Sequence, residues 1–223
     1  ESTGTPYTAP IPLTPPADHK SGLVIRARAF LNGQVASKTK THTYLLDLDS
    51  RLRGVPALLF NGDAGRDFYL PMGIMAISGG AYPGGLWQQT GPDTYNIPIN
   101  RGDPTERLIS AEWYYPDGGD GWREDVGVRL SSSPFSRPRL ILNQTGLSPW
   151  TADHTQKPSF NLYWRGDYGN SDVKDNSLIP DNDVNNYARL RIRAGKNDIN
   201  TPFVIDEVAR RLYRDMGWVE PTG

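Results

Sequence analysis

The stretch ERLISAEWYYPDGGDGWREDVGVRLS, residues 106–131, decides the fold. Its two strand-like halves flank a proline, aspartate and glycine turn at 116–119, and this combination predicts a β-hairpin. Another strand is predicted at 159–169, where Phe160, Leu162 and Trp164 alternate with other residues. A further strand is predicted at 187–195, where Leu190 and Ile192 alternate with arginines. These segments favour an antiparallel sheet.

The clearest helix signal is TPFVIDEVARRLYRDMGW at 201–218. Thr201 suits the N-cap, Pro202 suits the first helical position, and Gly217 suits the end of a helix. We expect this helix to pack on the sheet, which gives an α+β fold with antiparallel strands and one main C-terminal helix. The apolar face repeats with helical spacing at Ile205, Val208, Ala209, Leu212 and Met216.

The first 46 residues predict a second β element. A strand from Leu23 is joined to a strand at 40–46 by a turn at Asn32-Gly33, after a proline-rich extended segment. Two strands do not form a stable module alone, so either earlier strands precede Glu1 or the hairpin leans on the residues after it. We therefore expect a β module at 1–46, a linker at 47–54 and a main domain at 55–223. Within that domain, 55–70 predicts an entry strand, and 73–87 a strand followed by a glycine-rich loop.

The composition excludes several classes of function. The net charge is −1 with both signs interspersed, which argues against a nucleic-acid partner or a basic membrane surface. No apolar run approaches the roughly 20 residues of a membrane span. The chain has no cysteine, which excludes disulfides, thiolate catalysis and cysteine-ligated zinc. The first residue is Glu1 rather than methionine, so we expect a processed terminus.

Most short motifs are weak. The three histidines are far apart in the sequence, so we expect no histidine metal site. DNDVNN at 181–186 begins like a calcium loop but lacks its glycine and final glutamate, and predicts a surface turn. Arg-Gly-Asp occurs at 101–103 and 165–167, and we expect both to be chance matches. Lys157 before a strand and Glu207 on the helix match a pairing that protein kinases use to hold ATP phosphates. From the residues alone, Lys157 is more simply a solvated residue at the start of a strand.

The order of several segments resembles the CotH kinase family over about residues 55–217. The matching stretches are GRDFYLPMGIMAI, NRGDPTERLISAEWYYPDGGDGWREDVGVRL, SSSPFSRPRL, KPSFNLYWRGDYG, LRIRAGKND and FVIDEVARRLYRDMG. The first 46 residues resemble the end of a chitobiase-type C-terminal β module of the immunoglobulin-like kind.

The resemblance implies the N-terminal lobe of an atypical kinase that is secreted or displayed on a bacterial surface. Such a kinase uses ATP and Mg²⁺ to phosphorylate Ser or Thr of exported or coat proteins. The family's catalytic and metal-binding aspartates lie beyond the helix, so they are expected after Gly223, in a missing C-lobe or another chain. The chain alone is then inactive and exposes an apolar patch near Leu212 and Trp218. The positions that carry over as nucleotide-binding candidates are Arg137, Lys157, Arg193, Asn197, Asp198 and Glu207.

Two other classes of function stay open. The first is an extracellular structural or adhesive module that assembles with copies of itself or with a matrix, since abundant Tyr and Trp suit interfaces. The second is a carbohydrate-binding module, which requires exposed tryptophans among Trp87, Trp113 and Trp150.

Overall fold

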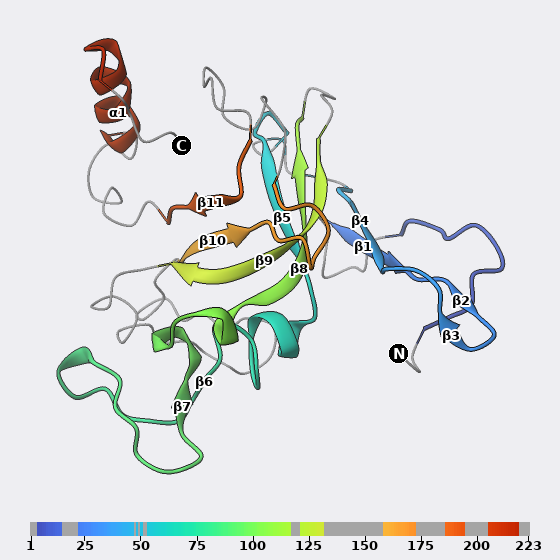
Figure 1. The fold of residues 1–223 in the computed structure, drawn as a ribbon, viewed down its shortest axis with the longest axis horizontal. Helices are drawn as coiled ribbons and strands as arrows, with labels where there is room; N and C mark the ends of the chain where they lie inside the picture. Colours follow the sequence, from blue (N-terminus) through green and yellow to red (C-terminus); the bar gives the residue numbers. More distant parts are fainter. Residues whose placement is uncertain are drawn as a thin grey trace. The chain divides into compact units, whose positions relative to one another are not determined.

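A computed structural model describes residues 4–14, 22–46, 48, 50, 53–116, 121–131, 158–172, 186–194 and 205–218. The described part of the chain is mostly antiparallel β with one main α-helix, as the sequence predicts (Figure 1). The largest sheet has the strand order β11-β10-β9-β8-β5. The chain divides into two compact units, of which the first contains Glu1–Asn61 and Ser110–Arg123, and the second contains Gly62–Ile109 and Glu124–Gly223.

The second unit contains the predicted strands around the hairpin. β9 (Arg123–Ser131) and β10 (Ser159–Tyr163) are antiparallel, and β10 pairs on its other side with β11 (Arg189–Ile192). β8 (Arg107–Tyr114) begins in this unit and ends in the first one. Because successive side chains of a strand point to opposite faces, alternation gathers the apolar residues on one face. The buried apolar residues of this unit are Ile74, Met75, Ala76, Ile77, Ile109, Val126, Val128, Leu130, Leu162, Trp164 and Tyr187.

The first unit contains the predicted N-terminal hairpin. β1 (Leu23–Ala27) pairs with β4 (Lys40–Tyr44), and the short strands β2 (Phe30–Leu31) and β3 (Gln34–Val35) flank the turn. Asn32 and Gly33 both adopt positive φ angles at its tip, which explains why this residue pair makes the turn. β5 (Ala57–Asn61) pairs with the end of β8 in the same unit.

The segment after β5 differs from the sequence expectation. Residues Ala64–Phe68 form a π-helical turn, and the strand predicted within 73–87, ahead of the glycine-rich loop, is reduced to β6 (Ile77–Ser78), which pairs with β7 (Tyr95–Asn96). The apolar residues 74–76 are buried, but their backbone folds back on the π-helical turn, with Ile74 N donating to Asp67 O and Met75 N to Phe68 O. An apolar run alone does not distinguish this packed return from a strand.

Three 3₁₀ turns complete the described part of the second unit: Pro83–Gly85, Ile97–Ile99 and Asp103–Thr105. The glycine-rich loop between β6 and β7 is held closed by Trp87, whose Nε1 donates to Gly79 O at 3.0 Å. A Cβ on Gly80 would lie 2.2 Å from Trp87 Nε1, so only glycine lets the indole approach the loop backbone.

The main helix α1 (Ile205–Asp215) confirms the predicted C-terminal helix. It ends in a Schellman motif, in which Trp218 N donates to Tyr213 O and Gly217 N donates to Arg214 O, with Gly217 at φ 79°. The Tyr213 and Trp218 rings lie 5.8 Å apart and supply the apolar contact that accompanies this motif. The predicted cap at 201–202 lies outside the described residues.

The predicted apolar face of α1 is not buried. The exposed fractions are 57% for Leu212, 59% for Trp218 and 70% for Met216, and Ile205 and Val208 are also exposed. The expectation that this face covers the core is therefore wrong for these side chains. The exposed patch near Leu212 and Trp218 is the one that the lobe interpretation predicts.

Candidate functional site

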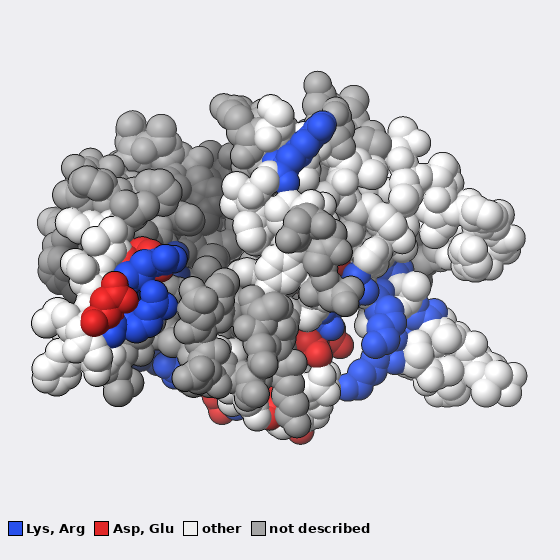
Figure 2. Space-filling model, turned by 90° about the horizontal axis from the view of Figure 1, so that it is seen from above, with Lys and Arg blue, Asp and Glu red and all other residues white. Residues whose placement is uncertain are grey.

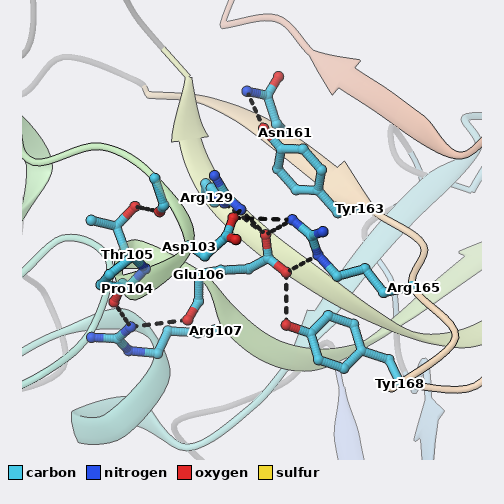
Figure 3. Close-up of polar contacts among 11 residues, drawn as sticks. Asp103, Pro104, Thr105, Glu106, Arg107, Arg129, Asn161, Tyr163, Arg165 and Tyr168 are labelled. Atoms are coloured by element: carbon cyan, nitrogen blue, oxygen red, sulfur yellow. Dashed lines mark hydrogen bonds and ion pairs between the residues drawn. The ribbon is translucent and has the colours of Figure 1, made fainter.

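A buried carboxylate organises a highly connected polar cluster among the described residues of the second unit. Glu106 follows the 3₁₀ turn Asp103–Thr105, and its side chain is only 3% exposed. Arg165 donates from Nε to Glu106 Oε1 at 2.7 Å and from Nη2 to Oε2 at 2.9 Å, which is a bidentate fork. Arg129 Nε donates to Oε2 at 2.6 Å, and the Tyr168 hydroxyl donates to Oε1 at 2.7 Å (Figure 3).

The sheet is shaped to receive this carboxylate. A Cβ on Gly127 of β9 would lie 2.3 Å from Glu106 Oε1, so glycine leaves the space that the carboxylate fills. Arg129 stands two residues further along the same strand and therefore on the same face. Arg165 and Tyr168 follow the end of β10. Three separate segments thus bring their polar groups to one position.

Asp103 joins the same cluster from the surface. Its side chain is 82% exposed, and it forms ion pairs with Arg129 and, at 3.4 Å, with Arg165. Asp103 belongs to the first Arg-Gly-Asp triplet and Arg165 to the second. The two triplets therefore meet in one ion-pair cluster, which gives both a structural role and leaves Asp103 already paired with arginine.

The electrostatics of the cluster keep Glu106 ionised. Burial by itself would raise the pKa of Glu106, but hydrogen bonds from Arg165, Tyr168 and Arg129 outweigh it and lower the pKa below the ordinary value. Burial and the hydrogen bond to Glu106 raise the pKa of Tyr168 to about 12. The hydrogen bond to Glu106 also raises the pKa of Arg165.

An aromatic ring lies among the arginines on this face. The guanidinium carbon of Arg129 is 4.5 Å from the centre of the Tyr163 ring, and those of Arg165 and Arg189 are 5.2 Å and 5.8 Å away. Distances below about 6 Å are those of cation–π contacts. The ring therefore helps to fix the arginine side chains in place.

This arrangement suits binding rather than proton transfer. A general base needs a pKa near the working pH and a free lone pair, whereas the Glu106 carboxylate has a lowered pKa and accepts from three side chains. The carboxylate instead orients two guanidinium groups, and oriented guanidinium groups recognise oxyanions. Any ligand binding on this face is therefore expected from its arginines and not from the carboxylate.

A second buried carboxylate lies in the first unit. Glu112 of β8 is 5% exposed and accepts from Thr43 N at 3.1 Å, Thr43 Oγ1 at 2.9 Å and Asn61 Nδ2 at 2.9 Å. Arg123 Nε lies 3.1 Å from Glu112 Oε2, and a further Arg123 nitrogen contacts His42 Nδ1. Glu112 thus ties the N-terminal hairpin to β5 and β8, which is one of the two arrangements that the sequence left open.

Only two of the six predicted nucleotide-binding residues lie in the described ranges. Arg193 is exposed directly after β11. Glu207 lies on α1, where its carboxylate accepts from Arg211 Nε at 2.8 Å and lies 3.2 Å from Arg210 Nη2. The other four, together with most of the calcium-like loop at 181–186, lie outside the described residues: Arg137, Lys157, Asn197 and Asp198.

The tryptophans proposed for carbohydrate binding are engaged in packing where they are described. Trp87 lies against Gly80, and Trp113 stacks on Trp122 with ring centres 6.3 Å apart and an angle of 15° between the planes. Both side chains are half-buried, and Trp150 lies outside the described residues. Sugar binding needs an open ring face, and these contacts give no observation that favours this class.

Charged groups are dispersed over the surface that can be seen. Figure 2 shows acidic and basic side chains in small groups among uncharged residues on the face it presents. Across the described ranges, no cluster of three or more His, Asp or Glu side chains is placed to hold a metal ion. None of the helices in the described part of the chain has the length and apolarity that crossing a bilayer requires.

Comparison of the chain with protein-family models, curated proteins and solved structures finds no match. A proposed function therefore rests on the residues and their geometry, and the relation to the CotH kinase family stays a prediction from the sequence.

The sequence interpretation did not select Glu106, Arg129, Arg165 or Tyr168. The residues of this cluster lie in separate segments of the sequence, and none of these segments alone indicates a site. Arg129 lies on a predicted strand, and Arg165 and Asp103 each lie in an Arg-Gly-Asp triplet that we interpreted as a chance match. The contacts join residues 23, 59 and 62 positions apart. Such pairs emerge only when the register of β9 and β10 is known.

Proposed function

We propose that this chain is the nucleotide-side lobe of a CotH-like kinase domain, which binds Mg-ATP and acts with a catalytic lobe on exported or coat proteins. The observation that carries the proposal is the order β8, β9, β10, β11 and α1, with the apolar face of α1 exposed. In the CotH-like arrangement that the resemblance implies, a helix follows the sheet and faces the second lobe.

The exposed face of α1 supports a docked partner lobe. An isolated helix of 11 residues is marginal in water, and helices of this length gain their stability from packing an apolar face. Leu212 and Met216 are one turn apart, with Val208 one turn before Leu212, so they form one stripe. Exposed apolar stripes rimmed by charged residues mark interaction sites.

The position of Glu207 is compatible with the role that the resemblance gives it. Its partners Arg210 and Arg211 lie on the same helix, at spacings of three and four residues. Exposed pairs of this kind contribute about 0.3–0.5 kcal/mol each. Exchanging one of them for Lys157 therefore costs little, and Lys157 would then be held in one geometry toward the phosphates.

Calorimetric titration with Mg-ATP tests the proposal. We expect binding by the wild-type chain and a loss of at least about tenfold in affinity for Lys157→Met, which corresponds to one phosphate-binding charge. Lys40→Met is the matched control, because Lys40 lies on the N-terminal hairpin in the other unit and is exposed. Equal affinity of the two variants, or no binding by the wild-type chain, contradicts the proposal.

A second candidate, a self-assembling extracellular module, is favoured by one observation in the first unit. Residues 4–14 are exposed and have no regular secondary structure, and Tyr7 is 75% exposed. Phe30 and Leu31 at the tip of the hairpin are also exposed. Sedimentation velocity distinguishes the candidates, because self-assembly predicts oligomers that grow with protein concentration and disappear when residues 4–14 are removed.

A further inference from the structure

The strand β11 forms one edge of the described sheet. It pairs with β10 through Phe160–Ile192 and Leu162–Leu190, and among the described residues it has no partner on its other side. Its side chains alternate, so that Arg189 and Arg191 are exposed while Leu190 and Ile192 are half-buried. An unpartnered edge presents unused backbone N–H and C=O groups to solvent.

Among the residues that the structure describes, the charge on the polar face of this edge is unbalanced. Arg129 and Arg165 are matched by Glu106 and Asp103. Arg189 and Arg191 have no acidic partner among the described residues, and Arg189 contacts the ring of Tyr163, at 5.8 Å. Asn161 of β10 pairs with Arg191 of β11 on one side and with Arg129 of β9 on the other. The edge therefore keeps two positive charges on one face.

Arginines on an edge also have a simpler role, because charged side chains keep sheet edges from pairing with other chains. That role requires charged side chains on the edge, but it does not require charged and apolar residues to alternate. Here Leu190 lies between the two arginines and Ile192 follows the second, and both lie on the side of the sheet that contains Leu162 and Val128. The edge thus offers a charged face and an apolar face to any strand that adds to it.

We propose that the free edge of β11 accepts an extended partner segment in which acidic and apolar side chains alternate. Added as a strand, such a segment places its acidic side chains about 5 Å from Arg189 and Arg191. Its apolar side chains then lie beside Leu190 and Ile192. Successive residues of one face in a strand are about 6.6 Å apart, so two carboxylates at alternate positions match the spacing of the two guanidinium groups.

The experiment is a binding titration of the whole chain with a synthetic peptide of alternating aspartate and valine. The control peptides have the same composition with all aspartates first, or carry asparagine in place of aspartate. We expect the alternating peptide to bind at least about fivefold more tightly than either control, because it alone satisfies the charge and the register. Amides of Arg189–Ile192 should also exchange more slowly with solvent when it is bound.

The protein variant that tests the site is Arg189→Gln with Arg191→Gln. The matched control is Arg26→Gln with Lys40→Gln, which removes the same charge from exposed positions on β1 and β4. We expect only the first pair of substitutions to weaken binding, by about fivefold or more. Equal binding of the alternating peptide and of the control peptide with all aspartates first would show plain charge attraction and overturn the proposal.

Two further results would also overturn it. One is an equal loss of peptide affinity in the two double variants, which would show that the net charge of the chain, and not the β11 edge, determines binding. The other is the absence of alternating-peptide binding up to about 1 mM, the weak end of specific recognition. If a short polyphosphate binds more tightly than the peptide and leaves the β11 amides unprotected, the edge recognises anions without strand addition, and the proposal is likewise overturned.

Discussion

Replacing Glu106 with glutamine tests whether the buried carboxylate holds the second unit together. The substitution keeps the shape of the side chain and removes its charge, so Arg165 and Arg129 lose their ion pairs with Glu106. The amide oxygen can still accept one hydrogen bond, but the amide nitrogen turns a donor toward a guanidinium group. Removing one partner of a buried ion pair costs about 3–5 kcal/mol. Arg165 is 37% exposed and is partly rescued by water, which places the expected loss at about 3 kcal/mol.

The assay is urea unfolding followed by tryptophan fluorescence, in which Trp164 reports on the core of the second unit. With a slope of about 2 kcal/mol per molar urea, the loss moves the midpoint down by about 1–2 M. Asp103→Asn is the control, because Asp103 contacts the same arginines but is 82% exposed. We expect it to cost no more than about 0.5 kcal/mol. The reasoning is refuted if the two variants unfold at the same urea concentration.

The same variant carries a pH signature. Because the pKa of Glu106 is lowered in the folded chain, its contribution to stability is complete above the ordinary pKa of 4.5 and is lost as the pH falls through the folded value. The stability difference between wild type and Glu106→Gln should therefore be constant from about pH 5 to 7, a window that follows from this shift, and should shrink in stronger acid. A difference that stays constant down to complete acid unfolding would contradict the assigned pKa.

Two contacts of the Glu106 cluster and the exposed face of α1 give three further predictions. Gly127→Ala should destabilise the chain by about 1–3 kcal/mol in urea unfolding, because its Cβ would lie 2.3 Å from Glu106 Oε1. Gly166→Ala is the control and should be near neutral, because no atom lies within 4 Å of the added Cβ. Tyr168→Phe should cost about 1–2 kcal/mol and remove from an ultraviolet absorbance titration the tyrosine that ionises near pH 12; an unchanged titration curve would count against the hydrogen bond to Glu106. Leu212→Ser with Met216→Ser should leave the free energy of unfolding within about 0.5 kcal/mol of wild type and should lower the binding of a hydrophobic dye. A large loss of stability would show that this face is packed.

The local parts of the fold were predictable from the sequence. The N-terminal hairpin followed from Asn32-Gly33, which adopts the positive φ angles that its turn requires. The main helix followed from the spacing of its apolar residues, and its end followed from Gly217. These elements depend on neighbours a few residues apart, which a sequence displays directly.

The parts that depend on distant residues were not predictable. The run at 73–76 is apolar, but it packs against the π-helical turn instead of extending as a strand, because Gly73 lies against the backbone of Phe68. The burial of the α1 face was also predicted wrongly, since periodicity shows that a face is apolar but not whether a partner covers it. The Glu106 cluster required the register of β9 and β10, which no local pattern supplies.

The central claim, that this chain holds ATP through Lys157, is tested most directly by an acyl-phosphate derivative of ATP. Such a probe transfers its acyl group to the amine of a lysine beside the terminal phosphate and releases the nucleotide, and mass spectrometry then identifies the acylated lysine. We predict acylation at Lys157, suppressed by excess Mg-ATP, with the exposed Lys38 and Lys40 labelled weakly and without regard to ATP. Acylation of Lys157 that is no stronger than that of Lys38 and Lys40, or that excess Mg-ATP leaves unchanged, would contradict the claim.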